Sequence, residues 1–203
     1  MPEYEGCFWH FIRLPEGGGY MMPDCGRVHL VHTENWFDRI VSAEAAGIIL
    51  TSLAVNRRLV GLAEVVDSDQ ILEPEAGTGA ILRAIREAAP LARCDSVELN
   101  ADLVRHLRDN FPGVSVWQGD FLAYRPENRY SKIIMNPPFH HAQDIRHIQR
   151  AVTLLAPGGV TVICLNGPRQ QSILKPLSDV WEPLPRGTFT YTDVSTALLR
   201  IAV

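Results

Sequence analysis

The segment Asn136-Pro137-Pro138-Phe139 contains residue types that can activate a weakly nucleophilic amine. Two successive prolines fix the backbone and remove two N–H donors, which leaves carbonyl oxygens available as acceptors. The Asn136 amide oxygen and the Pro137 carbonyl would accept both hydrogens of an –NH2 group. This favours the pyramidal amine whose lone pair can attack, so the stabilisation is directed at the transition state. Phe139 offers a face for stacking a planar substrate. A simple turn is the alternative for these four residues in isolation.

A glycine-containing loop, Glu73-Pro74-Glu75-Ala76-Gly77-Thr78-Gly79, lies between an expected strand and an expected helix. Its glycines allow a sharp turn and the close approach of a ligand, and the helix N-terminus presents free N–H groups. A dinucleotide pyrophosphate is disfavoured, because a third glycine is missing and because Glu73 and Glu75 would repel it. Carboxylates suit a cationic ligand instead, such as an amino or sulfonium group. A plain β-to-α turn is the alternative.

Two further acidic residues stand at predicted strand ends. Glu98 closes one strand, where an acidic side chain can accept hydrogen bonds from both hydroxyls of a ribose. Asp120 follows the next strand and can accept from an adenine amino group, with Phe121 against the ring. Ligands of open α/β sheets bind at the carboxyl edge of the strands, so we expect these side chains to meet there. A solvated glutamate and a capping aspartate are the simpler alternatives.

The elements that must position these residues alternate between short apolar strands and helices with apolar residues at three- and four-residue spacing. Asn100 can cap one helix, Pro112-Gly113 should end it, and Pro157-Gly158-Gly159 should end the next. Such repetition builds parallel βαβ units with right-handed crossovers. We predict strands over 70–73, 94–98, 114–118, 132–136 and 160–165, and helices over 79–89, 100–111 and 142–155.

The two ends of the chain complete the predicted organisation. Residues 180–184 and 194–203 would form an antiparallel pair at the sheet edge, and residues 43–63 one or two helices with a break or cap at Thr51-Ser52. Residues 1–42 alternate like strands (8–14 and 27–31) around turn-rich segments, which indicates a hairpin-like extension. We therefore predict an α/β fold over residues 43–203, a single Rossmann-like, doubly wound, mostly parallel seven-stranded sheet with an antiparallel edge strand.

Length and composition favour one soluble domain, with 203 residues, 46% hydrophobic residues and a net charge of −4. Apolar runs fall short of the roughly 18 residues that cross a bilayer, and the acidic first residues are unlike a signal peptide, so we expect a cytoplasmic protein without membrane contact. Residues 1–120 carry 10 basic and 18 acidic side chains (−8), and residues 121–203 carry 9 and 5 (+4). This basic C-terminal part is compatible with a nucleic-acid partner.

The order of these motifs resembles that of the class I S-adenosylmethionine-dependent methyltransferases, and more narrowly that of the enzymes that modify adenine N6 in DNA. The similarity covers about residues 44–203. It implies S-adenosylmethionine as the cofactor and no metal. The cofactor-binding residues that it implies are Thr51, Glu73, Ala76, Gly77, Gly79, Glu98, Leu99, Asp120, Phe121 and Asn136. The catalytic residues that it implies are Asn136, Pro137, Pro138 and Phe139.

The resemblance leads to a functional hypothesis, methyl transfer to adenine N6 in DNA. The base would be flipped out, stacked on Phe139 and held by Asn136 and Pro137. Similar signatures act on RNA bases and protein glutamine, so these substrates stay open, as does a non-catalytic cofactor-binding accessory or anti-restriction subunit. Since the core uses nearly all of the length, target selectivity should be low or come from residues 1–42, a homodimer or a partner specificity subunit.

A group of basic side chains surrounds the Asn-Pro-Pro-Phe signature and consists of Lys132, His140, His141, Arg146, His147 and Arg150. It would form a rim for phosphates, or a solvated helix face.

Four residues of zinc-ligand type, Cys7, His10, Cys25 and His29, lie in the N-terminal extension. Their spacing matches no strong zinc template, and the histidines can simply alternate in strands. All four cysteines are scattered through the chain, so a disulfide framework is not expected.

Overall fold

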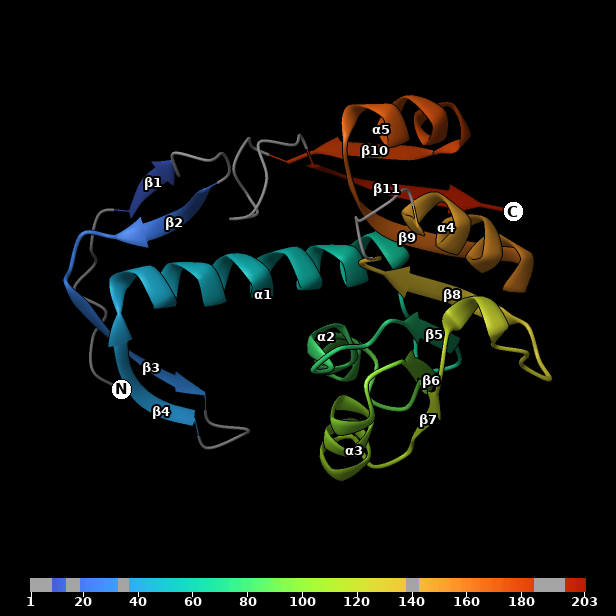
Figure 1. The fold of residues 1–203 in the computed structure, drawn as a ribbon, viewed down its shortest axis with the longest axis horizontal. Helices are drawn as coiled ribbons and strands as arrows, with labels where there is room; N and C mark the ends of the chain where they lie inside the picture. Colours follow the sequence, from blue (N-terminus) through green and yellow to red (C-terminus); the bar gives the residue numbers. More distant parts are fainter. Residues whose placement is uncertain (1–8, 14–18, 33–36, 138–142, 185–195) are drawn as a thin grey trace. The chain divides into compact units, whose positions relative to one another are not determined.

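The computed structural model describes residues 9–13, 19–32, 37–137, 143–184 and 196–203 (Figure 1). The chain forms two compact units. The first comprises residues 1–55 with 185–195, and the second comprises residues 56–184 with 196–203. The units divide within the helix that begins at Ala43, whereas the predicted boundary lies at the start of that helix.

The first unit contains two antiparallel hairpins. Strands β1 (Trp9–Arg13) and β2 (Gly19–Pro23) form one, and β3 (Arg27–His32) and β4 (Phe37–Ser42) form the other. Two of the four strands, β1 and β3, lie where the alternating pattern indicates them. Helix α1 (Ala43–Ala63) follows β4 directly, and the Ser42 hydroxyl accepts a hydrogen bond from the Ala45 N–H at 3.1 Å.

Helix α1 is continuous through Thr51 and Ser52, so the predicted break or cap at these residues is wrong. Both residues have the backbone N–H that proline lacks, and neither has the backbone freedom of glycine. Both are therefore tolerated inside a helix. By length and composition α1 could also cross a membrane, and core helices of soluble proteins have the same properties. Its C-terminal part belongs to the second unit and is held there by the ion pairs Arg57–Glu87 and Arg58–Glu182.

The second unit is built on a seven-stranded sheet with the order β10-β11-β9-β8-β5-β6-β7. The strands are β5 (Gln70–Pro74), β6 (Arg93–Glu98), β7 (Val114–Gln118), β8 (Tyr130–Met135), β9 (Leu155–Asn166), β10 (Val180–Pro183) and β11 (Thr196–Ala202). Five adjacent strands, β9, β8, β5, β6 and β7, are parallel, while β11 pairs antiparallel with β9 and with β10. The predicted mostly parallel, Rossmann-like sheet with an antiparallel edge is confirmed.

Helices α2 (Ala80–Ala88), α3 (Ala101–Asn110) and α4 (Gln143–Leu154) connect the parallel strands as predicted. The Asn100 side chain caps α3 by accepting from the N–H groups of Asp102 and Leu103 at 2.9 and 3.1 Å. A short helix, α5 (Pro168–Leu174), and the turns η1 (Phe121–Ala123) and η3 (Lys175–Leu177) are additional elements. The expectation that Pro157-Gly158-Gly159 ends α4 is wrong, because the helix ends at Leu154 and β9 runs through these residues.

A polar network crosses the sheet beneath its hydrophobic core. The Tyr130 hydroxyl donates to the Asp95 carboxylate at 2.6 Å and lies 2.8 Å from the Tyr124 hydroxyl. The Ser131 hydroxyl donates to Asp69 at 2.7 Å and accepts from the Gln70 N–H at 3.0 Å. Since buried polar groups need partners, these bonds favour one register among β5, β6 and β8.

Gly79 is a backbone position at which the fold demands glycine. Its φ is +79°, and a Cβ there would lie 2.4 Å from Phe111 Cε2 at the end of α3. We expect Gly79→Ala to lower the free energy of unfolding by about 2 kcal/mol or more. Gly61 is the matched control, because it lies inside α1 and a Cβ at this position would have no heavy atom within 4 Å. Gly61→Ala should raise stability by about 0.5–1 kcal/mol, and urea denaturation of both variants checks the opposite signs.

Candidate functional site

A cavity of about 320 Å³ opens at the carboxyl edge of the parallel strands in the second unit. It contains five residues that the sequence proposes as site residues, from three strand ends, namely Glu98, Leu99, Asp120, Phe121 and Asn136. The other lining residues are Glu75, Val97, Gly119 and His147. Because β5, β6, β7 and β8 are parallel neighbours, segments far apart in the chain end at one place.

Glu98 joins the glycine loop to the turn that enters α3. One carboxylate oxygen accepts from the Gly77 N–H at 2.8 Å, and the other accepts from the Asn100 N–H at 2.8 Å. The residue is only 8% exposed, yet it lines the cavity. Each carboxylate oxygen has a second lone pair, so Glu98 can still accept hydrogen bonds from a ligand.

The glycine loop follows β5, and backbone hydrogen bonds fix its conformation. The Ala76 N–H donates to the Val97 carbonyl at 3.0 Å, and the Gly79 N–H donates to the Ala76 carbonyl at 2.8 Å. Gly77 has φ +55°, and open space lies where its Cβ would be. The loop therefore exposes backbone without a side chain at Gly77. At Gly79 the end of α3 occupies the space where a side chain would lie.

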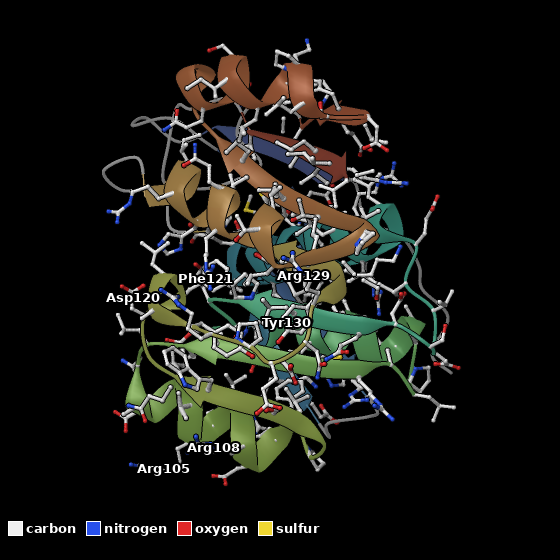
Figure 2. The ribbon with its side chains drawn as sticks, turned by 90° about the vertical axis from the view of Figure 1, so that its right-hand side faces the viewer. Arg105, Arg108, Asp120, Phe121, Arg129 and Tyr130 are labelled. Carbon is white, nitrogen blue, oxygen red and sulfur yellow. The ribbon has the colours of Figure 1, made fainter. Side chains whose placement is uncertain are left out.

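Asp120 and Phe121 follow β7 at the same edge (Figure 2). One Asp120 oxygen accepts from the Leu122 N–H at 2.9 Å and thereby caps η1, while the residue itself is exposed. Phe121 is buried and meets the His147 ring edge-on, with ring centroids 5.6 Å apart. The capping role of Asp120 and its place on the cavity wall coexist, because a carboxylate has two oxygens.

Asn136 and Pro137 follow β8, the strand next to β5. Asn136 is exposed and lines the cavity, and Pro137 is buried. Pro138 and Phe139 lie outside the described residues, so the predicted stacking face stays a prediction. The amide side chain of Asn136 thus lines the same cavity as the carboxylates of Glu98 and Asp120.

Glu73 and Glu75 each have one buried side-chain oxygen that can still accept a hydrogen bond. Among the described residues, neither Glu73 Oε2 nor Glu75 Oε2 has a hydrogen-bond partner. Burial raises the pKa of Glu73 well above its usual value, against a hydrogen bond from the Leu82 N–H that lowers it. Burial also raises the pKa of Glu75, and its hydrogen bond to His147 opposes this. Unpartnered buried acceptors beside bare backbone fit a ligand that brings positive charge and N–H or O–H donors.

His147 lies on α4 and is hydrogen-bonded through Nδ1 to Glu75 Oε1. It is only 7% exposed, so its predicted place in a basic rim or on a solvated helix face is wrong. Helical spacing could have revealed this, since His147, Ala151 and Leu154 share one buried face. Of the other rim residues, Arg146 is exposed and Lys132 and Arg150 are half-buried, while His140 and His141 lie outside the described residues.

The remaining proposed site residues belong to the first unit. Thr51 lies within α1, and its contact with the cofactor stays a prediction. In the part of the chain that the structure describes, no three His, Cys, Asp or Glu side chains are grouped to hold a metal ion. His29 Nε2 is 2.5 Å from Asp38 Oδ1, and Cys7 lies outside the described residues, so the zinc set is not tested.

The raised pKa of Glu73 predicts a pH dependence of stability. Its folded pKa lies above the unfolded value of 4.5, so the stability of the neutral form is fully present below pH 4.5. This stability is lost as the pH rises through the folded pKa. Glu73→Gln stays neutral, and at pH 8 the ligand-free variant should be more stable than the wild type by on the order of 1–3 kcal/mol.

Urea denaturation between pH 5 and pH 8 measures this difference. Glu127→Gln is the control, because Glu127 is exposed and should leave the pH profile unchanged. A Glu73→Gln profile parallel to that of the wild type would contradict a buried, strained carboxyl group.

Asp120→Asn tests the predicted hydrogen bond to the cofactor adenine. Asparagine can still cap η1 through its oxygen, but its amide nitrogen is a donor and cannot accept from an amino group. We expect the Kd for S-adenosylmethionine to rise about tenfold, as measured by calorimetry. Asp102→Asn on the exposed start of α3 is the control. Equal affinity in Asp120→Asn and the wild type would remove Asp120 from the cofactor site.

Two family models match this chain over different residue ranges that partly overlap. An antirestriction protein family model matches residues 2–74. The putative antirestriction protein YubI of Escherichia coli K12 is 78% identical over 59 residues, which are 29% of this chain and 42% of YubI.

The relatives of the other part are methyltransferases. The type II methyltransferase M.TthHB8I of Thermus thermophilus is 33% identical over 48% of this chain and 22% of its own length. The ribosomal RNA small subunit methyltransferase A of Synechococcus is 34% identical over 43% of this chain and 34% of its own length. This chain therefore spans less than half the length of each of these three curated relatives.

The fold has the same affiliation. The crystal structure of TrmN from Thermus thermophilus superposes with a TM-score of 0.60 and 16% identity, over 74% of this chain and 49% of TrmN. The family model of the methyltransferase small domain matches residues 52–181, which contain the glycine loop, Glu98, Asp120 and Asn136. Since this match covers more than half of the sequence, the chain belongs to the methyltransferase small domain family, and its cofactor is S-adenosylmethionine.

Proposed function

We propose that this methyltransferase modifies an exocyclic amino group, and that its substrate is adenine N6 in DNA. The observation that carries the proposal is the position of Asn136 on the wall of the cavity that also contains Glu98 and Asp120. An acceptor for an –NH2 group thereby opens onto the same space as the carboxylates proposed to bind the cofactor.

The residues at the end of β8 supply what this chemistry requires. The bound cofactor offers a methyl group on a positively charged sulfur. The Asn136 amide oxygen and the Pro137 carbonyl accept the two amine hydrogens, which localises the nitrogen lone pair for attack. The cofactor would supply the methyl group, with its sulfur–carbon bond breaking as the nitrogen–carbon bond forms, and the amine held by Asn136 and Pro137 would release one proton to water. Holding the two reactants in one cavity supplies much of the rate enhancement.

The relatives favour DNA among the amine substrates, and the charge of residues 121–203 favours a nucleic acid over a protein. M.TthHB8I is a type II methyltransferase, and antirestriction proteins are the relatives of residues 2–74. Residues 121–203, which contain Asn136, have a charge of +4 that would attract a phosphate backbone. A base in duplex DNA has to be flipped out of the stack to reach the cavity.

A ribosomal RNA adenine is the second candidate substrate. The specific observation in its favour is the 34% identity with ribosomal RNA small subunit methyltransferase A, which is similar to the identity with M.TthHB8I. Both candidates use the same amine-binding residues, so the choice between them depends on the nucleic acid and not on the chemistry. A protein glutamine amide would use the same residues as well.

Incubation with labelled S-adenosylmethionine and separate DNA, RNA and protein pools tests the substrate. We expect label in DNA, and digestion should yield N6-methyladenine. Label confined to RNA or protein would replace the leading substrate. Tight cofactor binding with no transfer to any pool would favour a non-catalytic antirestriction subunit.

Asn136→Ala tests the role of the amide. It should lower the rate of methyl transfer by at least about a hundredfold and leave the Kd for S-adenosylmethionine within about threefold of the wild type. Asn128→Ala, in the exposed turn before β8, is the matched control. Parallel loss of activity and of cofactor binding in Asn136→Ala would show that Asn136 belongs to the cofactor site alone.

A further inference from the structure

The Glu75–His147 pair is a feature of the cavity that methyl transfer to an amine does not require. Glu75 lies in the glycine loop and His147 on α4, and they are hydrogen-bonded between Oε1 and Nδ1. Both line the cavity, with side chains 21% and 9% exposed. Glu75 also has a φ of +57°, which is uncommon for a residue with a side chain. The loop therefore holds an unfavourable backbone conformation where this pair forms.

The cavity surrounds His147 with negative groups. Glu75, Glu98 and Asp120 line it from the ends of β5, β6 and β7, and Glu73 lies buried beneath the loop. Among the described lining residues, His147 is the one side chain that can become positively charged. On α4 itself Arg146 is exposed, and Arg150 donates to the Tyr124 carbonyl at 2.6 Å. The protonation of His147 thus changes the net charge of this cavity.

The cofactor and its product differ by one methyl group on the sulfur and by the positive charge that this third substituent gives it. S-adenosylmethionine carries a positive sulfonium, and S-adenosylhomocysteine carries a neutral thioether at the same position. All other polar groups of the two molecules are the same. The ratio of their dissociation constants therefore reports the electrostatic potential at the sulfur.

We propose that His147 is a specificity-determining residue that sets how strongly the cavity prefers the sulfonium cofactor over the thioether product. With a neutral imidazole, the ionised Glu75 leaves the pair at −1, which favours the cation. With a protonated imidazole the pair is neutral and this preference is reduced. The proposal rests on the cofactor of the family and not on the identity of the methyl acceptor.

The contacts of Glu75 support this assignment. Its Oε1 is occupied by His147, while its buried Oε2 has no partner among the described residues. A carboxylate in this state exerts its charge on whatever occupies the cavity, because little water screens it. Phe121 packs against the His147 ring and further restricts water at this point. The charge of the pair therefore acts at short range on a bound ligand.

Calorimetric titration of the ligand-free chain with each molecule from pH 5.5 to pH 7.5 tests the proposal. In the wild type, the ratio of the Kd for S-adenosylhomocysteine to the Kd for S-adenosylmethionine should fall on the order of tenfold as the pH is lowered. His147→Asn keeps an N–H near the Nδ1 position but does not titrate. Its ratio should stay constant and close to the wild-type value at pH 7.5.

Two further variants show whether the pH dependence belongs to this pair. His106→Asn, on the exposed face of α3, should retain the wild-type pH profile. Glu75→Gln removes the negative charge and should lower the ratio at every pH, which gives a second measurement if His147→Asn does not fold. A wild-type ratio that is independent of pH, or a His147→Asn change that weakens both ligands equally with the pH profile retained, would overturn the proposal.

Discussion

The carboxylate of Glu98 is the interaction on which the site depends. It accepts from the N–H of Gly77 in the glycine loop and from the N–H of Asn100 at the start of α3. Asn100 in turn caps α3, and the far end of that helix places Phe111 against Gly79. The Glu98 side chain thereby holds the glycine loop and the start of α3 together, and the other end of α3 contacts the same loop at Gly79. Glu98 has to do this while it remains available to a ligand, because its second lone pairs are free of backbone donors.

The electrostatics of the cavity follow from this arrangement. Bringing the ends of β5, β6 and β7 together also brings Glu73 and Glu75 close to the carboxylates of Glu98 and Asp120. Burial opposes the ionisation of Glu73 and Glu75, and repulsion from the neighbouring carboxylates adds to this effect. A ligand with a positive charge lowers the electrostatic cost of ionising these carboxyl groups. Without the ligand, the cofactor site therefore lowers the free energy of unfolding of the chain. Cofactor binding and folding are therefore coupled by the same carboxylates.

The two family matches meet in α1 and β5. The antirestriction model ends at residue 74 and the methyltransferase model begins at residue 52, so both include the C-terminal part of α1. This part of the helix carries Arg57 and Arg58, which are ion-paired with α2 and β10. From Asn56 onward the overlap is therefore part of the second unit and not a linker.

The sequence by itself determined the elements and the motifs whose causes are local. Alternating strands and helices, the Asn100 cap, the positive-φ glycines and the acidic strand ends depend on residues a few positions apart. In contrast, hairpin partners β2 and β4 and helix α5 carried no clear periodic signal, and α1 continues through Thr51 and Ser52 because a helix interior tolerates both residues.

Only the tertiary structure decided which of these groups face one another. Glu75 and His147 are 72 residues apart, and they meet because the sheet order places β5 beside β8, with α4 following β8. The same order buries an oxygen of Glu73 and one of Glu75 that have no hydrogen-bond partner within the described part of the chain. Local patterns place a residue on a strand or helix, but burial and long-range pairing depend on the arrangement of all the strands at once, and they set the charge of this cavity.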